Sequence, residues 1–195
     1  MSARRVLVTG ASRGIGRATA IRLALDGWSV AMHYGHDEAD AKRTHEELGK
    51  NASGLYRCDL SNAEAAKQLI VQASHEGPIH AVVNNAGIYM PMNFSKASDA
   101  EFEATLRKTF AINFESPARL ARLAARLFEN QGEGGKIINV CSRVGFRGES
   151  GAALYAASKA ALINLTRSLA IELAPKDVQL YGIAPGWVDT AMARA

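Results

Sequence analysis

The chain has 195 residues, of which 48% are hydrophobic, and its formal net charge is +4. This length and composition predict a single domain over residues 1–195 with a substantial core. Basic residues alternate with acidic ones and no run of five or more Lys or Arg occurs, which argues against nucleic-acid binding. No apolar segment reaches membrane-spanning length and the N-terminus has no apolar signal region, so we expect a cytoplasmic protein that does not enter a membrane.

The cysteines and histidines do not suggest a metal site. Cys58 and Cys141 each lie in an apolar stretch that is typical of a strand, where buried free thiols are expected. His33 and His36 are near each other, but no Cys or Glu completes a ligand set. We therefore predict no metal site and no disulfide.

Short β-branched segments alternate with longer segments rich in Ala, Leu and Arg. In chain order, the predicted strands are 4–9, 28–33, 53–58, 79–84, 136–141 and 178–184, and the predicted helices are 16–25, 37–48, 62–73, 99–128 and 152–173. Regular alternation of this kind predicts an α/β fold, with a doubly wound parallel sheet that helices cover on both faces. Ser61 and Glu64 predict a capping box for the helix 62–73, and Pro175 predicts the end of the last long helix.

The first predicted strand leads into a glycine-rich turn and then a helix. Gly10, Gly14 and Gly16 follow the pattern G-x-x-x-G-x-G. Such a turn before a helix predicts an anion site, because free N–H groups and the positive end of the helix dipole face the ligand. Gly10 would permit the tight turn, Gly14 a close approach to a pyrophosphate, and Gly16 close packing of the helix on the sheet. Taken alone, three glycines are also consistent with an ordinary turn.

Polar residues follow the third, fourth and fifth predicted strands. They are Asp59, the run Asn84-Asn85-Ala86-Gly87, and Ser142. Each of them is also explained locally, as a helix cap or a turn former. However, all three follow strands at the same edge of a parallel sheet, which is where open α/β sheets bind ligands. Their coincidence therefore favours a dinucleotide site at this edge.

Tyr155 and Lys159 lie four residues apart and would share one face of the last long helix. An ammonium group near a phenol lowers the pKa of the phenol, so the pair would exchange a proton near neutral pH. The alternative is a half-exposed Tyr beside a solvated Lys. Ser142, at the ligand edge, would donate a hydrogen bond to a carbonyl oxygen. Asn113, among apolar neighbours inside the predicted helix 99–128, would hold a proton-relay water or cap a kink.

Taken together, these residues resemble the short-chain dehydrogenase/reductase family, and within it the 3-oxoacyl-acyl-carrier-protein reductase branch. The resemblance extends from Arg4 to the C-terminus. It is carried by Thr9-Gly10-x-x-x-Gly14-x-Gly16, Asn84-Asn85-Ala86-Gly87, Asn113, Ser142, Tyr155-x-x-x-Lys159 and Pro185-Gly186-x-x-x-Thr190. It implies a Rossmann sheet with six of the family's seven strands present.

The resemblance also implies an enzyme that transfers a hydride between a nicotinamide dinucleotide and a carbonyl or alcohol. Tyr155 would be the general acid in reduction and the base in oxidation, and Ser142 would orient the substrate oxygen. Lys159 would lower the pKa of Tyr155 and bind the nicotinamide ribose, while Asn113 would hold the relay water. The implied cofactor contacts are Gly10, Ser12, Arg13, Gly14, Ile15, Gly16, Tyr34, Asp59, Leu60, Asn85, Ala86, Gly87, Tyr155, Lys159, Pro185, Gly186, Val188 and Thr190.

Charge favours NADP(H) over NAD(H). The second predicted strand ends in His33-Tyr34-Gly35, without the acidic residue that holds the ribose of NAD in the family. Arg13 would pair with a 2′-phosphate. Asp37 and Glu38 follow shortly and would weaken this preference, so NAD(H) stays an alternative.

Two features depart from the family's pattern. Tyr181-Gly182 stands where the family usually has Asn-Ala, and the chain ends at Ala195, soon after Thr190. Because family members usually continue through substrate-covering helices and a seventh strand, we expect a truncated chain with an open pocket and the sixth strand at the sheet edge. The alternative is a genuine short form with poor catalysis. The missing strand also contributes to the family's contacts between subunits, and we expect a dimer or tetramer.

Three functions follow as alternatives. The first is an NADP(H)-dependent carbonyl reductase acting on 3-oxoacyl thioesters. An acidic acyl carrier protein would then dock near Arg107, Arg119, Arg122 and Arg126, although the favoured interpretation of these arginines is ordinary solvated charge. The second is an NAD-dependent dehydrogenase of a sugar, steroid or other secondary alcohol. The third is a non-catalytic dinucleotide-binding or regulatory module.

Overall fold

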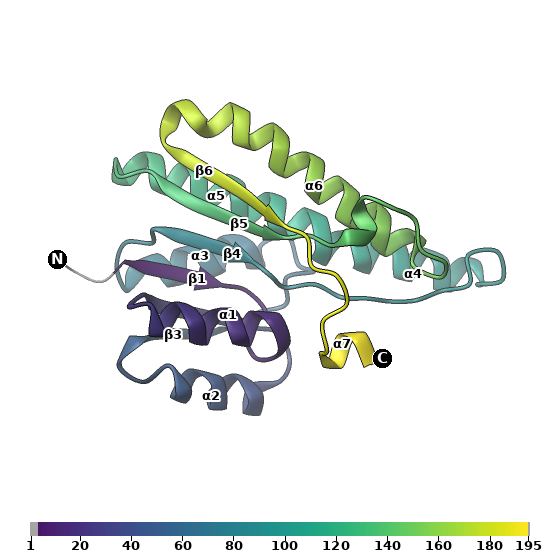
Figure 1. Cartoon of the computed structure of the whole chain (residues 1–195), viewed down its shortest axis with the longest axis horizontal. Helices are drawn as coiled ribbons and strands as arrows, with labels where there is room; N and C mark the ends of the chain where they lie inside the picture. Colours follow the sequence, from purple (N-terminus) through teal and green to yellow (C-terminus); the bar gives the residue numbers. More distant parts are fainter. Residues whose placement is uncertain (1–3, 195) are drawn as a thin grey trace.

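The computed structural model describes residues 4–194, and residues 1–3 and 195 of the expected domain lie outside this range. Six parallel strands form one sheet in the order β3-β2-β1-β4-β5-β6 (Figure 1). They are β1 (Arg5–Val8), β2 (Ser29–Tyr34), β3 (Ala52–Arg57), β4 (Ala81–Asn84), β5 (Gly135–Val140) and β6 (Val178–Ile183). The predicted doubly wound α/β sheet is confirmed, and each strand begins and ends close to its expected bounds.

Helices pack on both faces of this sheet. Helices α1 (Gly14–Leu25) and α2 (Glu38–Glu47) cover one face, and α3 (Ala65–His75), α5 (Ser116–Gln131) and α6 (Ala153–Leu173) cover the other (Figure 1). The side chains of β1 show why both layers form: Val6 and Val8 join the core under α1, and Leu7 joins the core under α3 and α5. Because successive side chains of a strand alternate between faces, an apolar strand fills two cores at once.

The expected continuous helix over 99–128 is wrong. The chain forms α4 (Asp99–Phe110), a π-helical segment (Ala111–Glu115) and then α5. Pro117 lies in the first turn of α5, and its ring would clash with the carbonyl four residues earlier, that of Asn113, in a regular α-helix. A wider π turn avoids this clash, and such turns are frequent at functional sites.

The expected capping box at Ser61 and Glu64 is also wrong. Helix α3 begins at Ala65, and Glu64 is its N-cap residue but caps it with no side-chain hydrogen bond. The Ser61 N–H instead donates to Asp59 Oδ1 at 2.9 Å, and the Glu64 N–H donates to Asn62 Oδ1 at 3.0 Å. These local side-chain bonds hold the chain in turns and delay the helix. Helix α6 ends at Leu173, and a short 3-10 turn (Ala174–Lys176) then contains Pro175.

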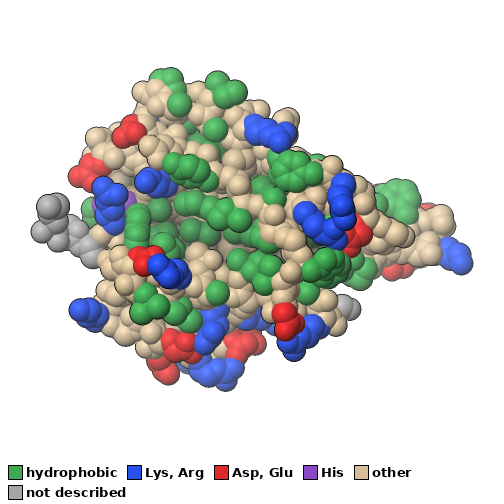
Figure 2. Space-filling view, in the orientation of Figure 1, with side chains coloured by type: hydrophobic (Ala, Val, Ile, Leu, Met, Phe, Trp, Pro, Cys, Tyr) green, Lys and Arg blue, Asp and Glu red, His purple; other side chains and the backbone are tan. Residues whose placement is uncertain are grey.

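Strand β6 is the edge of the sheet and is covered on one face only within residues 4–194. Val178 and Leu180 are buried, whereas Tyr181 and Ile183 are 48% and 54% exposed. Figure 2 shows hydrophobic side chains across the middle of the same face. A final short helix, α7 (Ala191–Arg194), follows an irregular segment after β6. Within the described range, no helix has both the length and the apolar character needed to span a bilayer.

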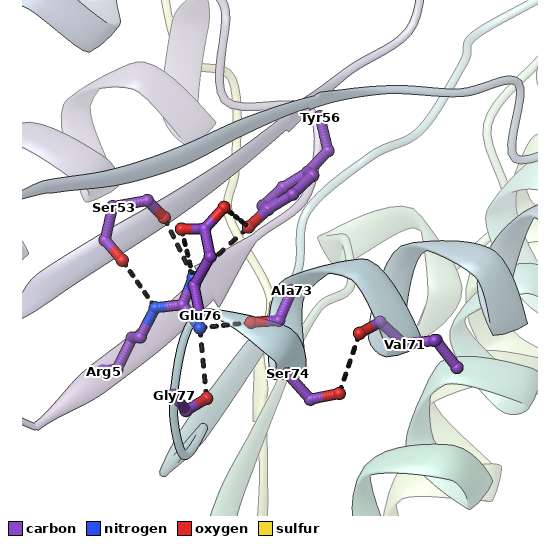
Figure 3. Close-up of polar contacts among 8 residues, drawn as sticks. All are labelled: Arg5, Ser53, Tyr56, Val71, Ala73, Ser74, Glu76 and Gly77. Atoms are coloured by element: carbon purple, nitrogen blue, oxygen red, sulfur yellow. Dashed lines mark hydrogen bonds and ion pairs between the residues drawn. The ribbon is translucent and has the colours of Figure 1, made fainter.

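A buried arginine joins three elements at the opposite end of the sheet from the strand carboxyl ends. Arg5, on β1, is 4% exposed, and its guanidinium donates hydrogen bonds to oxygens of Ser53, Tyr56, Ala73, Glu76 and Gly77 (Figure 3). The Tyr56 hydroxyl donates to the second carboxylate oxygen of Glu76 at 2.6 Å. The guanidinium thereby links β1 with β3, with the end of α3 and with the turn that follows it.

We expect Arg5→Met to lower the free energy of unfolding by roughly 3 kcal/mol, because it leaves buried carbonyl oxygens without a donor. Urea unfolding followed by circular dichroism measures the change. The matched control is Arg4→Met, since Arg4 is the adjacent residue and is exposed, and its replacement is expected to change stability by less than about 0.5 kcal/mol. Equal losses in the two variants would contradict the prediction.

Candidate active site

A cleft of about 880 Å³ runs along the carboxyl ends of the strands. The glycine-rich loop after β1 lines one part of it, and Ser142, Tyr155 and Lys159 line another. The predicted cofactor contacts that border the cleft are Gly10, Ser12, Arg13, Gly14, Ile15, Asp59, Leu60, Asn85, Ala86, Gly87, Tyr155, Lys159, Pro185, Gly186, Val188 and Thr190. The fold thus brings residues of helix α6 and of the loops after all six strands to one place.

Three predicted residues do not line the cleft. Tyr34 is the last residue of β2 and is buried, and the chain beyond it, residues 35–39, lines the cleft instead. Gly16 and Asn113 are both buried behind residues that line it. Sequence reasoning did not place His33, Tyr89, Arg143 and Trp187 in the site, although all four border the cleft. The signal that could have found them is their place in the chain, at or shortly after the carboxyl end of a strand.

The glycine loop is held by the end of β4. Asn85 Nδ2 donates to the carbonyl oxygens of Thr9 and Gly10, both at 2.9 Å. In return, the Thr9 hydroxyl accepts the N–H groups of Asn85 at 3.0 Å and Ala86 at 3.1 Å. Gly10 and Gly14 have φ values of +61° and +57°, a backbone region that favours glycine. These bonds present the loop and the first turn of α1 to the cleft.

Gly16 packs against this loop. A Cβ atom on Gly16 would lie 2.2 Å from the Gly10 carbonyl oxygen and 2.3 Å from Asn85 Nδ2. The sequence predicted that α1 packs closely on the sheet at this position. In the structure, the atoms that leave no room for a Cβ on Gly16 belong to the glycine loop and to Asn85. Arg13, the N-cap residue of α1, makes no side-chain capping bond. The unpaired N–H groups at this helix end favour an anion.

Tyr155 and Lys159 lie on α6 beside Ser142. Lys159 is 4% exposed, its Nζ donates to the Val140 carbonyl oxygen at 2.8 Å, and it lies 5.8 Å from the centre of the Tyr155 ring. Burial lowers the pKa of Lys159 to about 8. Burial also raises the pKa of Tyr155, and its hydrogen bond with Ser142 acts in the opposite direction. The expected lowering of the Tyr155 pKa by Lys159 is not found: burial is the largest influence, and Lys159 is not among the groups that shift this pKa.

Asn113 is fully buried in the π-helical segment. Its Oδ1 accepts the Ile88 N–H at 2.8 Å, and its Nδ2 donates to the Ile88 carbonyl at 2.9 Å and to Ser158 Oγ at 3.2 Å. A Cβ on Gly87 would lie 3.3 Å from Asn113 Oδ1 and 3.6 Å from Lys159 Nζ. Asn113 thus lies in the helix irregularity and near Lys159, and its side chain bonds Ile88 and Ser158 instead of capping the kink. Its role in holding a relay water stays a prediction.

Aromatic and charged side chains line the cleft together with Tyr155. The Tyr89 ring packs edge-on against Tyr155, with 5.2 Å between the ring centres. Arg143 forms an ion pair of 2.8 Å with Glu149, and its guanidinium lies 6.0 Å from the centre of the Trp187 ring. Nearby, Cys141 is a free thiol whose pKa is raised by burial. Both Cys58 and Cys141 directly follow strands and do not lie on them.

Comparison with known proteins decides the family. The family model for short chain dehydrogenases matches residues 4–195. The chain belongs to the short-chain dehydrogenase family. This short-chain dehydrogenase is therefore an NAD(P)-dependent oxidoreductase, and the predicted resemblance to the 3-oxoacyl-acyl-carrier-protein reductases is confirmed.

Among its relatives is the 3-oxoacyl-[acyl-carrier-protein] reductase MabA of Mycobacterium tuberculosis, with 35% identity over 98% of this chain and 72% of that protein. Another is the acetoacetyl-CoA reductase of Shinella zoogloeoides, with 35% identity over 98% of this short-chain dehydrogenase and 77% of the relative. A solved structure of 3-ketoacyl-(acyl-carrier-protein) reductase from Brucella melitensis, complexed with NADH, has a TM-score of 0.88 and 28% identity, covering 98% of this chain and 78% of that one.

Proposed function

We propose that this enzyme uses NADP(H) to reduce a carbonyl group, with 3-oxoacyl thioesters as its substrate class. The observation that carries the proposal is that Ser142, Tyr155 and the buried Lys159 meet in the same cleft as the glycine loop and the N-terminus of α1. Relatives named as 3-oxoacyl-acyl-carrier-protein and acetoacetyl-CoA reductases support the thioester substrate.

The residues of the cleft fit a dinucleotide. The pyrophosphate would lie on the loop Gly10–Gly16, where α1 has N–H groups without a side-chain cap. Asp59 and Leu60 would contact the adenine, Asn85-Ala86-Gly87 the adjoining ribose, and Lys159 the nicotinamide ribose. Pro185, Gly186, Val188 and Thr190 would surround the nicotinamide. The cofactor, when bound, supplies the hydride.

The charges at the end of β2 support NADP(H). Asp37 caps α2 by accepting the Asp40 N–H at 3.0 Å, and Glu38 pairs with Lys42 at 2.7 Å. Both acids are thus held by their own helix, and Lys42 compensates the charge of Glu38. Arg13 is exposed at the entrance of the loop, where its guanidinium would pair with a 2′-phosphate.

We expect kcat/KM to be higher for NADPH than for NADH, and Arg13→Ala to reduce the NADPH value by about tenfold, because one charge-assisted hydrogen bond is lost. Initial rates with each cofactor measure both effects. Arg17→Ala is the matched control. Arg17 lies on α1, whose N-cap residue is Arg13, but it pairs with Glu47 at 2.6 Å. A clear preference for NADH would overturn the proposal and favour an NAD-dependent dehydrogenase.

Three side chains would handle the proton. Because burial raises the pKa of Tyr155, its phenol is protonated at neutral pH and would donate to the substrate oxygen as the hydride arrives. The Ser142 hydroxyl would donate a hydrogen bond to the same oxygen and orient it. The Lys159 ammonium would stabilise the phenolate that forms. Lys159 would then return a proton to the Tyr155 phenolate, and Asn113, beside Gly87 and Lys159, would hold a water through which Lys159 is reprotonated.

This arrangement predicts that the reduction rate falls above about pH 8. Burial lowers the pKa of Lys159 to about 8, so its ammonium is present below that pH and is lost as the pH rises through it. Since reduction needs the cation beside the developing phenolate, kcat is expected to be level near pH 7 and to decline above pH 8. The profile of Lys159→Arg, which stays charged, would lack this decline. A wild-type profile that is level to pH 9.5 would contradict the prediction.

The substrate class is tested with a nicotinamide absorbance assay. Acetoacetyl-CoA and an acyl-carrier-protein thioester are compared with sugars, steroids and simple secondary alcohols. Higher kcat/KM for the carrier-protein thioester would support docking near α4 and α5, where Arg107, Arg122 and Arg126 are exposed and Arg119 pairs with Glu115 at 2.7 Å. Turnover of alcohols alone would favour the second function, and cofactor binding without any turnover would favour a regulatory module.

A further inference from the structure

His33 is a buried titratable residue that the proposed proton transfer does not use. It is the penultimate residue of β2, its side chain borders the cofactor cleft, and the residue is 2% exposed. A polar side chain buried to this extent needs partners for both of its ring nitrogens.

Each ring nitrogen of His33 has a backbone partner in a different loop. The Gly10 N–H donates to His33 Nδ1 at 3.3 Å, and His33 Nε2 lies 3.1 Å from the Cys58 carbonyl oxygen. An N–H can only donate and a carbonyl can only accept, so the hydrogen is on Nε2 and Nδ1 is unprotonated. Only the neutral ring satisfies both partners, because a hydrogen on Nδ1 would face the Gly10 N–H.

The surroundings keep the ring in this neutral form. Burial lowers the pKa of His33 to about 4, although the bond to Cys58 and the charge of Asp59 act in the opposite direction. Gly10 and Ala11, on the other side of the ring, bring no titratable group. The hydrogen bonds of the His33 ring to Gly10 and Cys58 therefore persist at the pH values at which the enzyme would be assayed, and His33 does not act as a pH switch.

The backbone of His33 adds a second bond to the same loop. Its carbonyl oxygen accepts the Ala11 N–H at 2.9 Å, so one residue holds two successive amides of the glycine loop. On the far side of the ring, Cys58 directly precedes Asp59 and Leu60, the proposed adenine contacts. The imidazole thus spans the distance between the pyrophosphate loop and the adenine side of the cleft.

We infer that His33 is a positioning residue for dinucleotide binding, which sets the separation between the glycine loop and the segment Cys58–Leu60. The inference rests on the cofactor site of the proposed function. Removing the imidazole leaves the partly buried Gly10 N–H without its acceptor, and the loop is then expected to shift. Such a shift moves the backbone that would bind the pyrophosphate, whereas Ser142, Tyr155 and Lys159 keep their places.

Three substitutions of His33 separate the effect of its bond to Gly10 from the effect of its bond to Cys58. The Oδ1 of an asparagine comes near the position of Nδ1 and can accept from Gly10, and the Nε2 of a glutamine comes near the position of the histidine Nε2 and can donate to Cys58. Leucine offers neither bond. The test therefore compares wild type with His33→Asn, His33→Gln and His33→Leu, by fluorescence titration of NADPH and NADH without substrate and by steady-state kinetics.

We expect His33→Leu to raise the dinucleotide Kd and KM by about tenfold or more, while kcat at saturating cofactor changes by less than about twofold. His33→Asn is expected to recover most of the affinity, and His33→Gln less, because the bond to Gly10 holds the loop that binds the pyrophosphate.

Several results would overturn the inference. Wild-type affinity in His33→Leu would do so, as would affinity losses of the same size in all three variants, in proportion to their losses of thermal stability. Both results leave the proposed function standing, because the wild-type enzyme still binds the dinucleotide. A wild-type enzyme that binds neither dinucleotide would instead remove the proposed function, and this inference with it.

Discussion

Tyr155→Phe is expected to reduce kcat for carbonyl reduction by about 10²–10⁴-fold, the usual contribution of a general acid, while the dinucleotide Kd stays within about twofold. The substitution removes only the hydroxyl, and the Phe ring can keep the edge-on packing against Tyr89. Ser142 can still orient the substrate oxygen, but the phenol that would deliver the proton is gone. Stopped-flow and steady-state measurements of nicotinamide absorbance separate the chemical step from binding.

The matched control for this prediction is Tyr181→Phe. Tyr181 is 48% exposed on β6, and its hydroxyl donates to Gln179. Its replacement is expected to leave kcat unchanged. If Tyr155→Phe retained more than half of the wild-type turnover, another group would have to supply the proton, and the roles proposed for Tyr155 and Lys159 would both be wrong.

Gly16→Ala is expected to lower kcat/KM by about 100-fold, the effect of displacing a binding group by about 1 Å. The added methyl carbon would lie 2.2 Å from the Gly10 carbonyl oxygen, which belongs to the backbone and cannot rotate away. Either the loop or the start of α1 must therefore move, and the pyrophosphate site is formed by both. Alanine is the better helix former by about 1 kcal/mol, which would offset part of any loss of stability.

Cofactor titration and kinetics of this variant are compared with those of Gly148→Ala. Gly148 has open space around its Cβ position and no positive φ, so the same chemical change is expected to have little effect there. A Gly16→Ala enzyme with wild-type affinity would show that the contacts of Gly16 with Gly10 and Asn85 do not determine the geometry of the loop.

Most of the fold was predictable because the signals that specify it are local. The strand–helix alternation predicted the parallel sheet, and the six strands were found close to their expected positions. The errors arose where local rules compete. Helical periodicity favoured one helix over 99–128, but the Pro117 ring excludes regular helix at that point, and a π turn resulted. Near Ser61, the Asp59 and Asn62 side chains accept hydrogen bonds from nearby amides in place of a capping box.

The sequence by itself determined which residue types reach the strand ends, and hence that a glycine loop, Ser142 and the pair Tyr155 and Lys159 share one edge of the sheet. The tertiary structure alone decided which atoms meet. Lys159 Nζ contacts the Val140 carbonyl, and the His33 ring lies between Gly10 and Cys58. These contacts join segments about 20 or more residues apart, so no local pattern encodes them. Burial also depends on packing of the whole chain, which is why the raised pKa of Tyr155 and the lowered pKa of Lys159 emerge only from the folded protein.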